Sequence, residues 1–239
     1  MRVLELFSGT GSVGKVAKKL GWEVLSLDLE LEADININIL DWDYKVFSPD
    51  TFDIVWASPP CISYSRLQCS WIGRVRNGKI FTKDDINNMM DESDKLVLKS
   101  LEIIKYFNPE FWFLENPQTG RLKDRDIMKD IPFYDVDYCM YSNWGYQKRT
   151  RIWTNKTLLN NLICDKSGSC GNMIDGKHKA RLGTGKTVMD NGKIIRVNTA
   201  ELRKKYKNFE NINDTENNGM NLLDRYRIPE NLIFSLFQN

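Results

Sequence analysis

The sequence predicts an α/β protein built on a doubly wound, mostly parallel sheet. Short apolar runs alternate with helical patterns through the first two-thirds of the 239 residues, and polar residues follow the ends of the apolar runs. Strands that alternate with crossover helices form parallel sheets with right-handed connections. With 41% apolar residues, the chain is long enough to bury a sizeable core.

The expected elements follow from the spacing of the apolar residues. Strands are predicted at residues 2–7, 23–27, 34–40, 52–57 and 111–114, and two more at 133–141 and 150–153 are close enough to pair as an antiparallel hairpin. Helical periodicity covers residues 13–20, 96–107 and 222–237. Gly21 suits the position just after the first of these helices.

Composition divides the chain into three parts. Residues 1–154 carry the alternating pattern and form the predicted main domain. Residues 155–221 are rich in Asn, Lys and Gly, with basic clusters at 177–181 and 203–207, and we expect a small insert there. Residues 222–239 regain helical periodicity, which predicts a C-terminal helix that packs back on the main domain.

Charge and cysteine content limit the partners. The 34 Lys+Arg against 32 Asp+Glu leave a net charge of +2, so a nucleic-acid surface must come from local clusters of cations. No apolar run approaches the length of a membrane span and no charged-then-apolar leader opens the chain, so we expect a cytoplasmic protein without a membrane partner. Five cysteines without a secretory signal favour a reducing compartment.

The candidate site lies where strands end, because open α/β sheets bind ligands at the carboxyl edges of their strands. The loop Phe7-Ser8-Gly9-Thr10-Gly11 follows the first strand, and its glycines let the backbone approach a ligand at a helix N-terminus. Asp28 ends the second strand, where a carboxylate binds a ribose diol, and Asp41 at the third suits an adenine amino group. The alternative is that both acids are helix caps or solvated loop residues.

A thiol follows the fourth strand in the segment Ser58-Pro59-Pro60-Cys61. Two prolines stiffen this segment and argue against an ordinary strand interior. Cys61 is therefore a candidate nucleophile if a cation or a helix end lowers the pKa of its thiol. A buried core cysteine is the alternative.

Two more polar motifs belong to the last strands. Glu115-Asn116-Pro117 ends the fifth strand, and Gln147-Lys148-Arg149-Thr150-Arg151 begins the seventh. Strand alternation places Gln147, Arg149 and Arg151 on one side. Each motif has an alternative interpretation. Glu115 is equally compatible with a capping or salt-bridged acid, and the basic motif with a solvated strand edge.

In this order, the segments resemble the DNA cytosine-C5 methyltransferase family over residues 1–154. Phe7-x-Gly9-x-Gly11 looks like its cofactor motif, Pro60-Cys61 like its catalytic Pro-Cys, Glu115-Asn116 like its Glu-Asn-Val motif and Gln147-x-Arg149-x-Arg151 like its Gln-x-Arg-x-Arg motif. The resemblance implies a Rossmann-like, S-adenosylmethionine-dependent enzyme that methylates C5 of cytosine in DNA on a flipped base.

The resemblance also implies a role for each matching residue. Cys61 would attack C6 of cytosine, protonated Glu115 would hydrogen-bond N3 and N4, and Arg151 would contact O2 with support from Arg149. The implied cofactor-binding residues are Phe7, Ser8, Gly9, Gly11, Asp28, Leu29, Asp41, Trp42 and Pro60. Residues 62–83 would form a mobile loop that closes over the base, and the implied DNA contacts are Ser65, Arg66, Arg74, Arg76 and Gln147.

The match departs from the family at several places. Ile62 stands where many members have Gln, Pro117 replaces Val, and the C-terminal segment keeps Pro229 and an apolar helix without the usual Gly-Asn pair. The insert is short for a target-recognition domain, so we expect low or short sequence specificity, or a protein partner that supplies it. The small size suits a virus or phage, which would place the protein in the host cytoplasm or nucleus. The sequence does not predict the oligomeric state.

The insert also holds metal-ligating side chains. Cys164, Cys170 and His178, with Cys139 before them, would make a structural Cys₃His zinc site in a segment that is poor in core residues. The Cys-x5-Cys spacing is not that of a tight zinc knuckle, and the alternative for Cys139 is a residue of the strand core.

Two other functions compete with DNA methylation. Ser58-Pro59-Pro60-Cys61 also looks like the tRNA-methylating relatives of the family, which predicts an RNA cytosine-C5 methyltransferase. A catalytically silent homologue that binds nucleic acid or regulates a partner is the other, and the intact Cys61, Glu115, Arg149 and Arg151 argue against it. Adenine-N6 and cytosine-N4 methyltransferases are disfavoured because they place an aromatic residue after the double proline, where this chain has Cys61.

Overall fold

The computed structural model describes residues 1–157, 162–181, 187–210 and 225–238. The chain divides into two compact units, Met1–Tyr134 with Thr150–Leu158, and Asp135–Arg149 with Leu159–Asn239. Parts of the predicted insert, and the first residues of the predicted C-terminal helix at 222–224, lie outside the described residues. The domain boundaries expected at residues 154 and 221 stay predictions.

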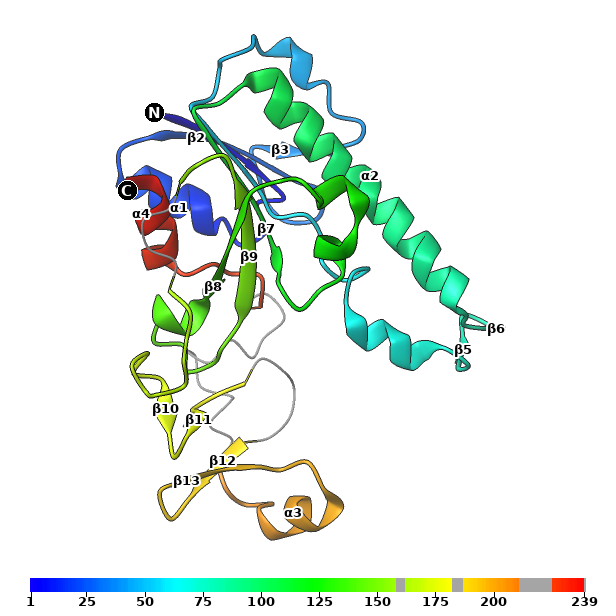
Figure 1. Ribbon diagram of the computed structural model, residues 1–239, viewed down its shortest axis with the longest axis vertical. Coiled ribbons are helices and arrows are strands. Elements are labelled where there is room, and N and C mark those ends of the chain that lie inside the picture. Colours follow the sequence, from blue (N-terminus) through cyan, green and yellow to red (C-terminus); the bar gives the residue numbers. More distant parts are fainter. Residues whose placement is uncertain (158–161, 182–186, 211–224, 239) are drawn as a thin grey trace. The chain divides into compact units, whose positions relative to one another are not determined.

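A seven-stranded sheet has the order β3-β2-β1-β4-β7-β9-β8 (Figure 1), and its strands from β3 to β7 lie wholly in the first unit. Its strands are β1 (Arg2–Leu6), β2 (Glu23–Asp28), β3 (Ile35–Asn36), β4 (Ile54–Ala57), β7 (Phe111–Pro117), β8 (Phe133–Asp137) and β9 (Arg149–Thr154). The pairs from β3 to β7 are parallel, and β9 runs antiparallel to β7. The predicted α/β class with a mostly parallel sheet is confirmed.

The strand expected at residues 34–40 is wrong in length. Only Ile35–Asn36 pairs with β2, because the chain then turns: the Asn38 side chain accepts a hydrogen bond from Leu40 N at 3.0 Å, and the Asn38 carbonyl accepts one from Asp41 N at 2.9 Å. An Asx turn of this kind competes with strand pairing. The alternating Ile residues here therefore reflect contact with the core and not an extended strand.

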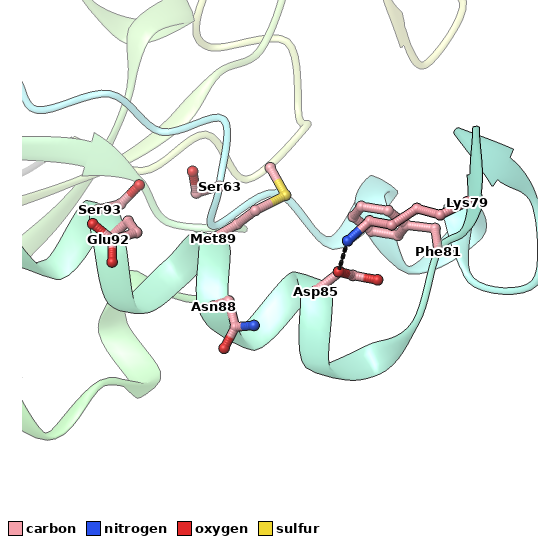
Figure 2. Close-up of a pocket in the computed structure, with 8 residues that line it drawn as sticks. All are labelled: Ser63, Lys79, Phe81, Asp85, Asn88, Met89, Glu92 and Ser93. Atoms are coloured by element: carbon pink, nitrogen blue, oxygen red, sulfur yellow. Dashed lines mark hydrogen bonds and ion pairs between the residues drawn. The ribbon is translucent and has the colours of Figure 1, made fainter. Parts of the chain in front are cut away.

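Two α-helices belong to the first unit, α1 (Ser12–Lys19) and α2 (Lys83–Phe107). As predicted, Gly21 follows α1 in a left-handed conformation, with φ of +76°. Thr82 and Asp85 form a reciprocal capping box at the start of α2. Asp85 also pairs with Lys79 at 2.5 Å (Figure 2). The short helices of this unit are η1 (Tyr44–Val46), η2 (Arg66–Trp71), η3 (Leu122–Asp124) and η4 (Asp126–Met128), and a small hairpin joins β5 (Val75–Arg76) to β6 (Lys79–Ile80).

The second unit is built from short pieces. Its elements are η5 (Tyr138–Met140), β10 (Met173–Ile174), β11 (Lys177–His178), β12 (Thr187–Asp190), β13 (Lys193–Arg196), α3 (Ala200–Lys205) and α4 (Glu230–Gln238). β10 pairs with β11 and β12 with β13, both antiparallel. Within the described residues, no helix has both the length and the apolar composition needed to cross a membrane.

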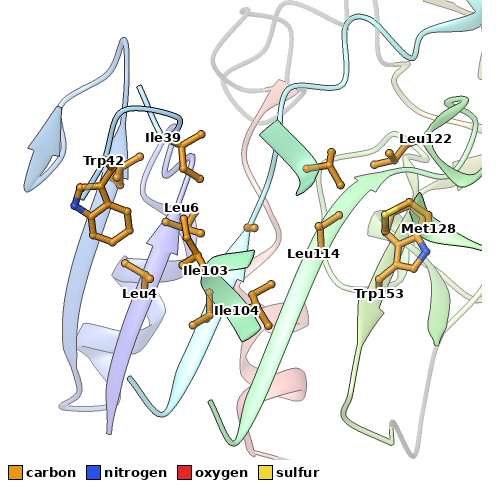
Figure 3. Close-up of a cluster of buried hydrophobic side chains, with 14 of the residues drawn as sticks. Leu4, Leu6, Ile39, Trp42, Ile103, Ile104, Leu114, Leu122, Met128 and Trp153 are labelled. Carbon is orange, nitrogen blue, oxygen red and sulfur yellow. The ribbon is translucent and has the colours of Figure 1, made fainter. Parts of the chain in front are cut away.

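The main apolar core lies between one face of the sheet and α2. Figure 3 shows Leu4 and Leu6 of β1 in one layer with Ile103 and Ile104 of α2. Leu114 of β7 and Trp153 of β9 belong to the same cluster. Because strand side chains alternate, Val3 and Glu5 must leave β1 on the opposite face.

Glu5 links that opposite face to α1. Its carboxylate accepts hydrogen bonds from Val13 N at 3.1 Å and Gly14 N at 2.9 Å, and the residue is only 3% exposed. Burial raises the pKa of Glu5 to about 7, although the two amide donors oppose the shift. Gly14 permits this contact, since a Cβ there would lie 2.8 Å from Glu5 Oε2.

We predict that Glu5 makes the protein less stable as the pH rises from about 4.5 to about 7. In this window the folded chain holds the proton more tightly than the unfolded chain. The contribution of Glu5 to the free energy of unfolding is therefore fully present below about pH 4.5 and is lost as the pH rises to about 7. The difference amounts to at most about 3 kcal/mol. Chemical denaturation of wild type and Glu5→Gln from pH 4.5 to 8 measures it, and the variant should lack this component. An identical pH dependence in both proteins would contradict the assignment.

Candidate active site

The strand order reverses between β1 and β4, which is where ligands bind in open α/β sheets. The glycine-rich loop leaves the carboxyl end of β1, and the Ser58–Cys61 segment leaves the carboxyl end of β4. Ser58 N donates to Leu6 O at 3.2 Å, which joins the starts of the two segments. The fold therefore places the predicted cofactor loop and the predicted nucleophile side by side.

The glycine-rich loop has a defined backbone. Phe7, Gly9 and Gly11 all have positive φ, at 57°, 54° and 66°. Glycine adopts this conformation without strain, whereas Phe7 adopts it at a cost. Gly11 N donates to Ser8 O at 2.8 Å, and Ser8 N donates to Leu27 O at 3.0 Å. The loop is thus closed on itself and attached to β2.

Asp28 holds this loop from the end of β2. Its Oδ2 accepts from Gly9 N at 2.9 Å, and its Oδ1 accepts from Glu30 N and Leu31 N, each at 2.9 Å. A carboxylate oxygen has two lone pairs, so Oδ2 keeps capacity for a further donor. The ribose contact predicted for Asp28 stays a prediction, and the adjacent Leu29 is 61% exposed.

The predicted adenine contacts have contrasting environments. Asp41 is exposed, whereas Trp42 belongs to the core, with its ring centroid 6.1 Å from that of Tyr44 and 6.3 Å from that of Phe47. Trp42 therefore has a packing role that explains its burial, and its cofactor contact stays a prediction.

A buried hydrogen bond ties the Cys61 segment to the Glu115 strand. Asn116 is fully buried, and its Nδ2 donates to Pro59 O at 2.9 Å. Cys61 is half-buried beyond the exposed Pro60, and its carbonyl accepts from Tyr64 N at 3.2 Å. The structure thus brings the Pro-Cys and Glu-Asn motifs together through their neighbours.

Glu115 and Arg151 occupy neighbouring positions of the β7–β9 ladder. Glu115, 7% exposed, lies opposite Ile152, and Arg151 lies opposite Asn116. Opposed residues of an antiparallel pair share a face, so the two side chains leave the strands on opposite faces near the carboxyl end of β7. The Arg151 guanidinium lies 3.5 Å from the centroid of the Phe133 ring.

The other two side chains of the Gln-x-Arg-x-Arg motif both contact Asp137. Arg149 donates to it through Nε at 3.2 Å and Nη2 at 2.7 Å, and Gln147 Nε2 donates at 3.0 Å. Cys164 N adds a fourth donor at 2.9 Å. Burial alone would raise the pKa of Asp137, but these bonds hold it below its ordinary value. Arg149 is therefore oriented by a buried carboxylate, as a supporting residue would be.

The segment predicted to contact DNA is cationic and exposes apolar side chains. Residues 62–83 contain five Lys and Arg and no Asp or Glu. Exposed apolar residues of the segment are Ile62, Leu67, Ile72, Val75 and Ile80. Ser65 caps η2 by accepting from Leu67 N at 3.3 Å, and Arg76 stacks on Trp71 at 3.6 Å. Arg74 is exposed, and Arg66 pairs with Asp124 at 3.2 Å with both side chains largely in solvent.

A buried network anchors the start of this segment to α2. Tyr64 OH donates to Asp94 Oδ1 at 2.8 Å, and Arg125 donates to Asp94 Oδ2 and to Asp91. Burial, with the neighbouring Asp94, raises the pKa of Tyr64. The anchor lies three residues after Cys61, so it limits how far that end of the segment can move.

A pocket of about 480 Å³ lies beside this anchor, and Figure 2 shows its lining. It is lined by Ser63, Lys79, Phe81, Asp85, Asn88, Met89, Glu92 and Ser93. Its lining comes from residues 63–93 and holds neither Cys61 nor Glu115. We assign it no part of the chemistry.

The predicted metal ligands are gathered in the second unit. The ligand atoms of Cys139, Cys164, Cys170 and His178 all lie within 4.8 Å of one another. Cys139, Cys164 and His178 are buried, and Cys170 is half-buried. None of the five cysteines, all of which lie in the described part of the chain, forms a disulfide.

Sequence reasoning missed four residues that position the site. Glu5 offered a weak signal, as a charged residue in an apolar strand, and Asn116 was noted only as the companion of Glu115. Asp137 and Tyr64 offered none. The hydrogen-bond partners of these four residues are distant in sequence, or are determined by the strand register.

The fold and the site define a Rossmann-like α/β methyltransferase, with a glycine-rich loop at the switch point and a thiol just beyond the end of the adjacent strand. The chain is 44% identical over 175 residues to the "Probable DNA (cytosine-5)-methyltransferase" of Frog virus 3 (isolate Goorha), an alignment that covers 72% of this chain and 79% of that protein. The solved structure of the Entamoeba histolytica methyltransferase EhMeth shares the fold, with a TM-score of 0.52 at 15% identity over 100% of this chain and 97% of that one. No protein-family model matches the sequence.

The identity and coverage of the viral relative place this chain in the DNA (cytosine-5)-methyltransferase family. This confirms the resemblance drawn from the four short motifs. The roles of the individual site residues stay predictions.

We predict that Asn116→Ala disturbs both the fold and the site. The change leaves the buried Pro59 carbonyl without its donor, which costs about 1–3 kcal/mol of unfolding free energy. A displacement of Cys61 by about 1 Å would lower kcat about 100-fold. Denaturant titration and single-turnover kinetics measure the two effects. The exposed Asn88, changed to Ala, is the matched control and should alter neither; wild-type kinetics in Asn116→Ala would refute the positioning role.

Proposed function

We propose that this protein transfers the methyl group of S-adenosylmethionine to C5 of cytosine in DNA. One observation carries the proposal: Cys61 follows the end of β4, and Glu115 lies near the carboxyl end of β7, the adjacent parallel strand, next to the glycine-rich loop at the switch point. The viral relative supports DNA as the polymer and the host cytoplasm or nucleus as the place of action.

The residues around the glycine-rich loop fit the cofactor. Ser8 Oγ is buried and, among the described residues, has no hydrogen-bond partner, so it is available to a polar group of a bound molecule. Phe7 would pack on the adenine, Asp28 would accept from the ribose and Asp41 from the adenine amino group. Leu29, Trp42 and Pro60 would line the same site. When bound, the sulfonium supplies an electrophilic methyl group.

Cys61 would supply the nucleophile. Its thiolate attacks C6 of the cytosine, which forms an S–C6 bond and makes C5 electron-rich enough to take the methyl group. Loss of the C5 proton to solvent then breaks the S–C6 bond and frees the thiolate. Protonated Glu115 would hydrogen-bond N3 and the N4 amino group and neutralise the charge that develops on the ring.

Arg151 would contact O2 of the base, which requires its guanidinium to turn away from the Phe133 ring and to reach past the end of β7 from the face opposite Glu115. Arg149 would support the site while it stays paired with Asp137. Both faces of the cytosine must be reached, so the base has to leave the duplex at a cost of a few kcal/mol. The cations and exposed apolar residues of residues 62–83 suit contact with the phosphates and the vacated stack.

We predict that Cys61→Ser abolishes methyl transfer, because a serine hydroxyl is far less ionised than a thiol and a weaker nucleophile. The assay measures transfer of labelled methyl groups to duplex DNA and, separately, to tRNA. Cys69→Ser is the matched control and should retain activity, because Cys69 is exposed on η2. A covalent adduct with 5-fluorocytosine DNA should form with wild type and with Cys69→Ser, but not with Cys61→Ser.

The possible results separate the candidate functions. Transfer to tRNA alone would replace DNA by RNA as the substrate. Full activity of Cys61→Ser would refute the covalent route. No transfer to either polymer, with binding retained, would refute the enzyme and favour a silent nucleic-acid-binding homologue.

We also predict that a double change, Arg74→Gln with Arg76→Gln, weakens DNA binding. It should also lower the slope of log Kd against the logarithm of the salt concentration by about one to two. The reason is that each lost phosphate contact releases one counterion fewer. Fluorescence anisotropy across a salt series measures the slope. Lys105→Gln, in the last turn of α2, is the control; equal slopes in all three proteins would remove these arginines from the interface.

A further inference from the structure

The Cys/His cluster of the second unit has the geometry of a metal centre. Cys164 Sγ lies 3.6 Å from His178 Nε2, and Cys170 Sγ lies 3.7 Å from the same nitrogen. The Cys139 ligand atom completes a set in which no separation exceeds 4.8 Å. In a tetrahedral site, Zn–S bonds of about 2.3 Å and Zn–N bonds of about 2.0 Å separate the ligand atoms by about 3.5–3.8 Å. The observed separations need little adjustment to match.

The four ligands come from separate segments. Cys139 lies in η5, Cys164 and Cys170 lie in loops, and His178 ends β11. The apolar cluster formed by Val188, Val197 and Tyr206 lies in and directly after β12, β13 and α3, in the part of the chain that follows the last ligand, His178. A bound ion would join these four segments directly.

Asn172 already shapes the loops around the ligands. Its Nδ2 donates to Cys139 O at 2.8 Å, Cys170 O at 3.0 Å and Ser142 O at 2.8 Å, and its Oδ1 accepts from Gly145 N at 3.1 Å. The residue is only 2% exposed. Two ligand-bearing segments are thus fixed through their backbones, independently of the thiols.

We propose that Cys139, Cys164, Cys170 and His178 bind one structural Zn²⁺. Four protein ligands complete a tetrahedral shell, which is the pattern of a structural and not a catalytic zinc. The thiols bind as thiolates and release their protons on binding, and the imidazole binds as a neutral base. No oxidation or reduction is involved.

The metal would also support the start of β9, where the Gln-x-Arg-x-Arg motif lies. Cys164 donates its backbone N–H to Asp137, and Asp137 holds Arg149 and Gln147. Fixing Cys164 therefore fixes one donor of the carboxylate that orients Arg149. This link to catalysis rests on the function proposed above, whereas the metal site itself does not.

The test is metal analysis of the full chain, purified without chelators or a metal-affinity tag. We expect about one equivalent of zinc per chain in wild type, and below about half an equivalent in Cys170→Ser. Cys69→Ser is the matched control, because Cys69 is a free thiol outside the cluster, and it should keep the full equivalent. Cys170 is only half-buried, so its replacement by serine is the mildest change to the fold.

A spectroscopic readout keeps the test independent of activity and of folding defects in the variants. Wild type in which Co²⁺ replaces the zinc should show thiolate-to-cobalt charge transfer and the intense visible bands of a tetrahedral ion, and Cys69→Ser should match it. Below about half an equivalent of zinc in wild type, with no cobalt spectrum after reconstitution, would overturn the site. Loss of zinc from Cys69→Ser would overturn the assignment of ligands.

Discussion

The arrangement of the active site depends on the hydrogen bond from Asn116 Nδ2 to the Pro59 carbonyl. It joins β7 to the segment after β4 at the point where one carries Glu115 and the other Cys61. Proline has no N–H and a fixed φ, so Pro59 and Pro60 bring rigidity to the segment but form no ladder hydrogen bond of their own. The amide of Asn116 provides the missing connection. Because Asn116 is fully buried, water does not compete for the bond, and the separation of thiol and carboxyl group follows from the sheet register.

Other buried polar groups act in the same way around this connection. Glu5 binds the first amides of α1 and so fixes the far end of the glycine-rich loop, while Asp28 fixes its middle. Asp94 binds Tyr64 and fixes the start of the cationic segment. Each carboxylate satisfies donors that would otherwise be buried without a partner. Removal of any one of them therefore leaves unsatisfied donors and destabilises a loop of the site. The apolar core between the sheet and α2 supplies stability, and these carboxylates determine where the loops lie.

The sheet was predictable from sequence, because buried parallel strands are short apolar runs that end at glycine, proline or an acid. Residues 2–7, 52–57 and 111–114 carry that pattern and match β1, β4 and β7 closely. The motifs at their ends were predictable for the same reason. The extent of β3 was not, since Asn38 closes a turn that strand alternation does not reveal. Asp137 was not predictable either, because its role needs Gln147, Arg149 and Cys164 to meet on one carboxylate through tertiary contacts.

The ligand segments of the second unit share a dense set of polar contacts, and this bears on the role of the insert. In the first unit, one apolar cluster joins the sheet to α2, so the position of each strand follows from burial. The ligand segments of the second unit are joined by polar contacts, with Asn172 binding three carbonyls and Asp137 four donors. Hydrogen bonds are directional but individually weak, so the segments that they join would gain much from one strong tetrahedral centre. A zinc ion at the Cys/His cluster would therefore hold these segments in place, as apolar contacts with α2 hold the strands of the sheet.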